Sequence, residues 1–258
     1  MALVRISFEE DSTNSTTGNG QFLLVNEGTD CGPYTIDPPP HDYNYFLSQL
    51  HAVNQYFENV SYGKFGIDLA QSSIYPSSLN GNYQLSNTMD FYNPYDDPSG
   101  QEGKLTKLFK DAIEQSYSED AIEFSKYDLV VVFHAGIGQD FSLPFLDPTP
   151  EDIPSTYIDE DMIQEHLGES NIIVGNHAIQ KGIILPETQN HLLYDISETM
   201  FSDAENPCEY QYGITGTFSL MIGFAIGLPP LWNIQTGESG VGVFGLMDQG
   251  SNNGRGII

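Results

Sequence analysis

Runs of apolar residues predict the strands of this chain. Alternating apolar and β-branched residues over 2–8 predict a first strand. The unbroken apolar run over 129–133 predicts a central strand that is buried on both faces of a sheet. Further strands are predicted over 64–75, around 83–85, and at 172–174 and 183–185, the last two as a hairpin.

Apolar residues at intervals of three and four predict the helices. A stripe of this kind from Phe46 to Phe57 predicts a long amphipathic helix. This helix should begin after Asp42, its N-cap, and end near Gly63. A second amphipathic helix is predicted over 105–113.

The remaining pattern concerns loops and the number of domains. Residues 145–162 are rich in proline and acidic residues, which predicts a surface loop. No internal repeat and no break in composition divides the 258 residues. We therefore expect a single domain over 1–258 with an α+β fold.

The chain is strongly acidic, with 36 acidic and 8 basic residues and a formal net charge of −28. Nucleic acid and anionic membrane surfaces need clustered Lys and Arg, so both are excluded as expected partners. Carboxylates in loops suit weak binding of calcium, as in a calcium-stabilised adhesion-type domain, and they equally suit plain solvation. Both interpretations stay open. The candidate calcium ligands are Asp96, Asp97, Asp147 and Asp159.

The longest apolar run, over 218–232, lies inside the stretch GITGTFSLMIGFAIGLPPLWN at 213–233. The run is short and is interrupted by glycine and proline, so it does not span a bilayer. Leu220 and Phe224 lie one helical turn apart on one face, with Met221 beside them. Taken alone, these three residues describe an ordinary buried helix.

With its flanks, this stretch resembles the immune-inhibitor-A-like metallopeptidases of bacteria. The resemblance rests on Gly227 with the LPPLW run that follows it, and on the Gly-rich segment SGVGVFGLMDQGSNNG. Upstream, three more motifs look like this family: TTGNGQF at 16–22, PPHDYNYF at 39–46 and VVFHAGIGQD at 131–140. The resemblance therefore covers nearly the whole chain.

The resemblance assigns a role to the apolar positions of the helix. In these metallopeptidases the helix carries His-Glu-x-x-His, then a glycine three residues on, then a third zinc ligand. Here the two His positions hold Leu220 and Phe224, the Glu position Met221, and the third-ligand position Pro230. None of the four can ligate zinc or take a proton from water. Met247 matches the methionine of the family's Met-turn.

The fold that the resemblance implies is zincin-type, or metzincin-like. We expect a mixed twisted sheet with the helix after Asp42 and the apolar helix packed on one face, closed by the Met-turn segment. Leu220, Met221, Phe224 and Pro230 should be largely buried where metal and water would lie, with Met247 close beneath them.

The function that the resemblance implies is that of a catalytically silent metallopeptidase-like domain, a pseudopeptidase with a binding or structural role toward an unknown protein or peptide partner. No cofactor is expected: zinc should be absent, while calcium stays open. The family implies a secreted or cell-surface location and a larger multidomain chain. The alternative is an active zinc metalloendopeptidase that uses non-standard ligands, such as His166, His177 and His191 with an aspartate.

The chain has two cysteines, Cys31 and Cys208, which are too few for a disulfide scaffold and lack Cys-x-x-Cys spacing. The extracytoplasmic location implied by the resemblance makes them candidates for a single disulfide. Such a bond would tie the N-terminal loop to the entry of the apolar helix.

Overall fold

The computed structural model describes residues 1–25, 31–140, 148–190 and 211–252. At its centre is a mixed six-stranded sheet in the order β2-β1-β4-β8-β5, with β3 also paired to β1. Only the edge strand β5 runs antiparallel, against β8. The strands are β1 (Ala2–Ser7), β2 (Ser73–Tyr75), β3 (Tyr83–Gln84), β4 (Val130–Ile137), β5 (Thr156–Ile158) and β8 (Gly182–Thr188).

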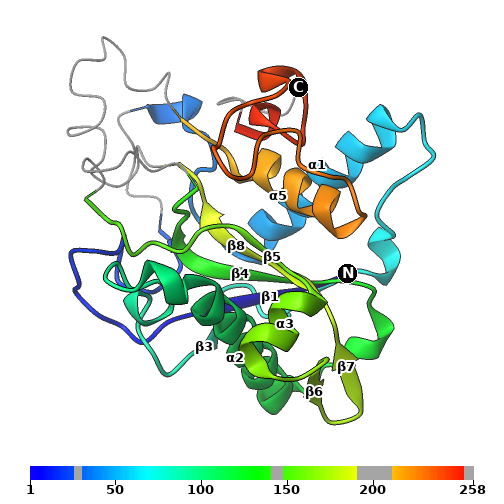
Figure 1. Cartoon of the computed structure of the whole chain (residues 1–258). Helices are drawn as coiled ribbons and strands as arrows, with labels where there is room; N and C mark the ends of the chain where they lie inside the picture. Colours follow the sequence, from blue (N-terminus) through cyan, green and yellow to red (C-terminus); the bar gives the residue numbers. More distant parts are fainter. Residues whose placement is uncertain (26–30, 141–147, 191–210, 253–258) are drawn as a thin grey trace.

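Helices cover both faces of this sheet (Figure 1). On one face lie α1 (Tyr43–Val60) and α5 (Ile214–Ala225), which pack against each other. On the other face lie α2 (Gln101–Asp120) and α3 (Glu160–Leu167). The expected mixed sheet and the expected placement of the two helices on one face are therefore confirmed.

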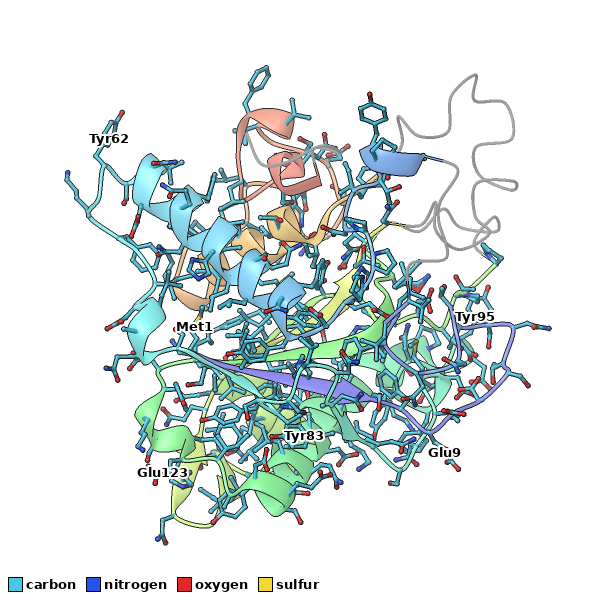
Figure 2. All side chains as sticks on the ribbon, turned by 180° about the vertical axis from the view of Figure 1, so that it is seen from behind. Met1, Glu9, Tyr62, Tyr83, Tyr95 and Glu123 are labelled. Carbon is cyan, nitrogen blue, oxygen red and sulfur yellow. The ribbon has the colours of Figure 1, made fainter. Side chains whose placement is uncertain are left out.

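Each face has its own hydrophobic core, and β4 contributes to both. Val130 and Val132 belong to the core under α2 and α3. Val131 and Phe133 belong to the core under α1 and α5, as alternation along a strand requires. This arrangement confirms the prediction that the run over 129–133 is buried on both faces. Figure 2 shows side chains filling the space on both sides of the sheet, with Tyr83 on the α2 side.

A side-chain cap explains where α1 begins. The Asp42 carboxylate accepts hydrogen bonds from the backbone N–H groups of Asn44 and Tyr45, so α1 begins where the sequence predicts. Helix α2 is longer at both ends than the predicted 105–113, and it ends at Ala121 in a left-handed conformation.

Three sequence-based predictions of secondary structure were wrong. Within 64–75 only β2 is a strand, because the Asp68 carboxylate caps a 3-10 turn at Leu69–Gln71 instead. The segment 145–162 is more than a surface loop, since it contains β5 and the start of α3. Three of its acidic residues are the N-cap Asp159 and, in the first turn of that helix, Glu160 and Asp161, where carboxylates are favourable.

The third error concerns the hairpin. The strand β6 (Ile172–Val174) pairs with β7 (His177–Ile179) through a two-residue turn at 175–176. Residues 183–185 instead belong to β8 in the central sheet, where every position is buried. The remaining elements are short 3-10 helices at Gly32–Tyr34, Asp90–Tyr92, Pro98–Gly100, Phe124–Lys126, Gly242–Phe244 and Gln249–Asn252.

Candidate binding cleft

A cleft of about 800 Å³ opens between α5, the edge strand β5 and the segment that follows α5. Helix α5 supplies its first wall. Residues 214, 218 and 222 of α5 are buried in the core against the sheet. The neighbouring stripe on the same helix faces the cleft and consists of Thr217, Leu220, Met221 and Phe224.

The positions matched to zinc ligands are partly inside this stripe. Leu220 is 9% exposed and Met221 7%, so the expected burial of these two is confirmed. Phe224 and Pro230 are only half-buried, contrary to expectation. Pro230 is not among the lining residues, and the cleft stays open above the other three.

Phe224 is less buried than expected because it belongs to an aromatic wall of the cleft. Its ring stacks on Tyr157 of β5, with 6.5 Å between centroids and 21° between planes. On the other side it meets the edge of Trp232, 5.8 Å away. Tyr157, Phe224 and Trp232 are called the aromatic wall below. The ring gains aromatic contacts here while it stays partly exposed.

Met247 lies against α5, as expected. It is 5% exposed and shares its core with Leu220 and Met221. A Cβ on Gly223 would lie 2.4 Å from the Met247 sulfur, so only glycine allows this approach. The backbone carbonyl of Met247 also accepts a hydrogen bond from the Leu231 N–H at 2.7 Å.

Asp248 fixes the loop on the far side of the cleft. Its Oδ2 accepts hydrogen bonds from the backbone N–H groups of Gly240, Val241 and Gly242 at 2.8–2.9 Å, and from the Ser239 hydroxyl. Desolvation alone would raise the pKa of Asp248, but these donors lower it to about 2. Successive N–H groups around one carboxylate form a nest that holds the loop in place.

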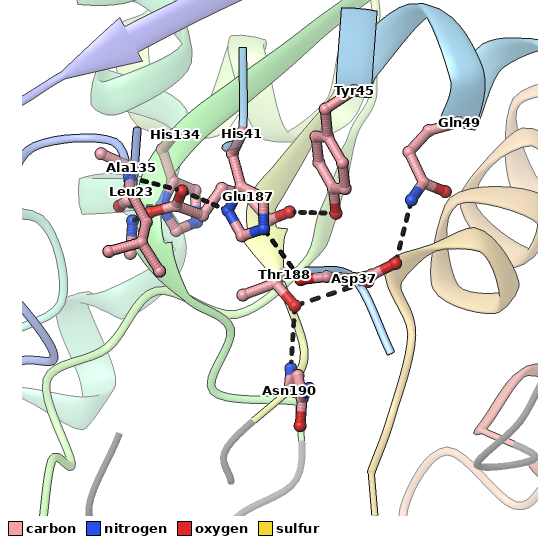
Figure 3. Close-up of polar contacts among 11 residues, drawn as sticks. Leu23, Asp37, His41, Tyr45, Gln49, His134, Ala135, Glu187, Thr188 and Asn190 are labelled. Carbon is pink, nitrogen blue, oxygen red and sulfur yellow. Dashed lines mark hydrogen bonds and ion pairs between the residues drawn. The ribbon is translucent and has the colours of Figure 1, made fainter. Parts of the chain in front are cut away.

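A second polar arrangement is buried at the carboxyl ends of β4 and β8 (Figure 3). The Glu187 carboxylate accepts hydrogen bonds from His41 Nδ1 at 2.6 Å, from the Gly136 N–H at 2.7 Å and from the Leu23 N–H at 2.9 Å. Burial would lower the pKa of His41, but the hydrogen bond and charge of Glu187 raise it above its ordinary value. The pair is almost fully buried.

This network also fixes the start of α5. The backbone carbonyl of Asp37 lies 3.0 Å from His41 Nε2. The Asp37 carboxylate accepts a hydrogen bond from the Ile214 N–H at 2.7 Å. Gln49 of α1 donates to the same carboxylate at 3.0 Å and accepts from the Thr215 hydroxyl. Burial raises the pKa of Asp37. These contacts couple α1, β8 and α5, and the sequence pattern did not predict them.

Two of the three histidines considered as alternative metal ligands are described, and each contacts a different residue. His166 lies 3.5 Å from Glu102, and His177 contacts Ser125. His191 lies outside the described residues. Among the residues that the structure describes, no group of three or more His, Cys, Asp and Glu side chains could hold a metal ion.

The candidate calcium ligands are also dispersed. Asp97 caps a 3-10 turn by accepting from the Gly100 N–H, and Asp159 caps α3 by accepting from the Met162 N–H. Asp96 is exposed, and Asp147 lies outside the described residues. Asp97 and Asp159 therefore hold a chain turn and a helix start.

Cys31 is disulfide-bonded. Its expected partner, Cys208, lies outside the described residues. His134, in the middle of β4, is fully buried, and burial lowers its pKa to about 4. Its Nδ1 lies 2.9 Å from the Ala135 carbonyl, which gives it a structural role.

No protein-family model matches the chain, and no curated protein matches it. Within the described part of the chain, none of the helices combines the length and the apolar character needed to cross a membrane.

Proposed function

We propose that this chain is a metallopeptidase-like domain that binds an extended peptide in the cleft beside β5 without cleaving it. The observation that carries the proposal is the combination of an open cleft with an apolar helix stripe. The side chains of Leu220, Met221 and Phe224 reach the cleft, and none of them can bind zinc or act as a base. The mixed sheet, the shared face of α1 and α5, and Met247 against α5 support the resemblance to zincin-type domains.

The edge strand β5 supports the binding of an extended peptide. Among the described residues, no strand pairs with the outer side of β5, and Thr156 and Tyr157 line the cleft. A free strand edge offers backbone N–H and C=O groups to a further strand. A peptide added there would direct alternate side chains toward α5 and the aromatic wall.

Asp140 and Asp248, two of the three carboxylates of the cleft, support binding rather than hydrolysis. Asp248 uses its oxygens to hold its own loop. Asp140 accepts hydrogen bonds from the N–H and hydroxyl of Ser155 and from Gln189. A general base must be within reach of water with a lone pair to spare, and both groups are already committed to internal bonds.

A peptide-binding measurement tests the proposal. Peptides selected from a random extended library on the purified chain should lose affinity for F224A by about tenfold, the loss expected for an aromatic contact worth about 1.5 kcal/mol. The control Y62A removes an aromatic ring that is 91% exposed at the end of α1, where Figure 2 shows it pointing away from the body. Equal effects of the two variants would reject the cleft as the binding site.

Catalytic silence needs its own assay. Casein should be hydrolysed no faster than in buffer, with or without added zinc, and dialysed protein should hold no stoichiometric zinc. Chelator-sensitive proteolysis would instead favour the active metalloendopeptidase with non-standard ligands.

A further inference from the structure

We propose that the peptide held in the cleft is basic, with an arginine whose guanidinium stacks on the aromatic wall and pairs with Glu102 at the rim. This inference rests on the proposed function and specifies the class of peptide. It is carried by two properties of the lining that occur together: the sign of its charge and its partly exposed aromatic rings.

The charge of the lining is entirely negative. Its acidic residues are Glu102, Asp140 and Asp248, and the described lining contains no Lys, Arg or His. Burial raises the pKa of Asp140, so Glu102 and Asp248 carry most of this charge. Lys181, on the cleft's side of the sheet, binds the Ala225 carbonyl at the end of α5 instead. With a net charge of −28 on the whole chain, the cleft attracts cationic groups and repels anionic ones.

The pKa of Tyr157, which lines the cleft, is affected by nearby negative charges. Burial raises the pKa of its phenol, and the charges of Asp159 and Glu160 raise it further. These two carboxylates begin α3 directly after β5, so a peptide paired with β5 would run beside them. Negative charge therefore lies at the end of β5 that leads into α3.

Among the carboxylates, Glu102 is the one free to pair with an incoming cation. Its side chain is 72% exposed, and its only described charged neighbour is His166 at 3.5 Å. Asp140 and Asp248 contribute to the field, but their oxygens already accept internal hydrogen bonds.

Arginine suits this combination better than lysine. A guanidinium is planar, weakly hydrated and able to stack on an aromatic face while it donates two hydrogen bonds to a carboxylate. An ammonium is a strongly hydrated point charge that gains less from an aromatic ring in a partly open cleft. The stacked and edge-on rings of the aromatic wall offer such a face.

The test uses four fluorescein-labelled nonapeptides in which Leu alternates with Arg, Lys, Ser or Glu, measured by fluorescence anisotropy at about 0.15 M salt, where the screening length is about 8 Å. The Arg peptide should bind tightest and the Glu peptide weakest. E102Q should weaken the Arg peptide about threefold, as expected for an exposed ion pair. F224L keeps an apolar side chain but removes the ring, and should weaken it about fivefold.

The control E119Q removes an exposed carboxylate from the far end of α2 and should leave affinity unchanged. Equal losses for E102Q and E119Q, with none for F224L, would mean attraction to the acidic surface in general and would overturn the inference. Equal affinity for the Ser and Arg peptides, still sensitive to F224L, would overturn it while the proposed function stands. Failure of all four peptides to bind would overturn both.

Discussion

Helices α2 and α3 pack on their face of the sheet through a continuous core of apolar side chains, whereas α1 and α5 share theirs with a cleft and a buried polar network. On the first face, the Phe109 ring lies so close to Gly182 that a Cβ there would be 2.1 Å from it. On the second face, apolar packing stops at Phe224, whose ring borders the cleft. One face of the sheet is thus packed by apolar side chains, while the other combines a core with an open cleft.

The largest expected effect is on stability, and it should be common to both cores. F109A on α2 and F218A on α5 each remove a fully buried ring. F218A also removes the edge contact with Phe133, whose ring centroid lies 5.3 Å away. Each should lower the free energy of unfolding by about 3–5 kcal/mol. Urea denaturation measures this loss. A much smaller loss for F218A would mean that the α5 face contributes little to stability.

A smaller loss of stability is expected at Phe224, which lies six residues after Phe218 on α5. Comparing these two positions sharpens the contrast between core and cleft. F224A should cost about 1–2 kcal/mol, less than F218A, because the ring is only half-buried. Its loss of peptide binding should exceed that of F109A, which keeps the cleft intact. The same denaturation and anisotropy measurements give both values. If F224A is as destabilising as F218A, the cleft wall is part of the core.

A pH-dependent effect should be confined to the face with the polar network. The pKa of His41 is higher in the folded chain than the ordinary histidine value of about 6.5. The pair with Glu187 therefore makes its full contribution to the stability of the fold at pH values below about 6.5. That contribution is lost as the pH rises through the raised value. The difference in unfolding free energy between the wild type and H41Q should therefore shrink from pH 6 to pH 9. A difference that is independent of pH would contradict the ion pair.

The smallest expected effect appears only in acid and concerns the loop held by Asp248. Its folded pKa of about 2 lies below the ordinary value of about 3.9, so its contribution is present above pH 4 and is lost as the pH falls toward 2. The stability difference between wild type and D248N should shrink over that interval. D96N, at an exposed aspartate, serves as the control, and a similar profile for D96N would count against the nest.

The sequence predicted those parts of the fold that have a long, regular pattern. Strands β1 and β4 and helix α1 followed from alternation, from an unbroken apolar run and from a helical stripe with an Asp cap. Helix α5 was predicted too, together with the contact of Met247 with its core. In these segments local pattern and tertiary packing favour the same structure.

The parts that the sequence did not predict depend on contacts between distant residues. Strand β5 has three residues inside an acidic segment, and only its pairing with β8 makes it a strand. The network joins Asp37, His41 and Glu187, and the last two are 146 positions apart, with no local signal of their contact. Phe224 looks like a core residue in the sequence, and only Tyr157 and Trp232 make it part of a cleft wall.

The hydrogen bond from the Ile214 N–H to Asp37 has a consequence for how the chain folds, because it joins residues 177 positions apart. During synthesis from the N-terminus, α1 and β1 emerge early, but the helix that completes their face emerges only after most of the chain has been made. The face formed by α2 and α3 has all its elements by residue 188. We therefore expect that face to be assembled on the ribosome first, leaving the apolar side of α1 exposed for the longest time and most dependent on chaperones.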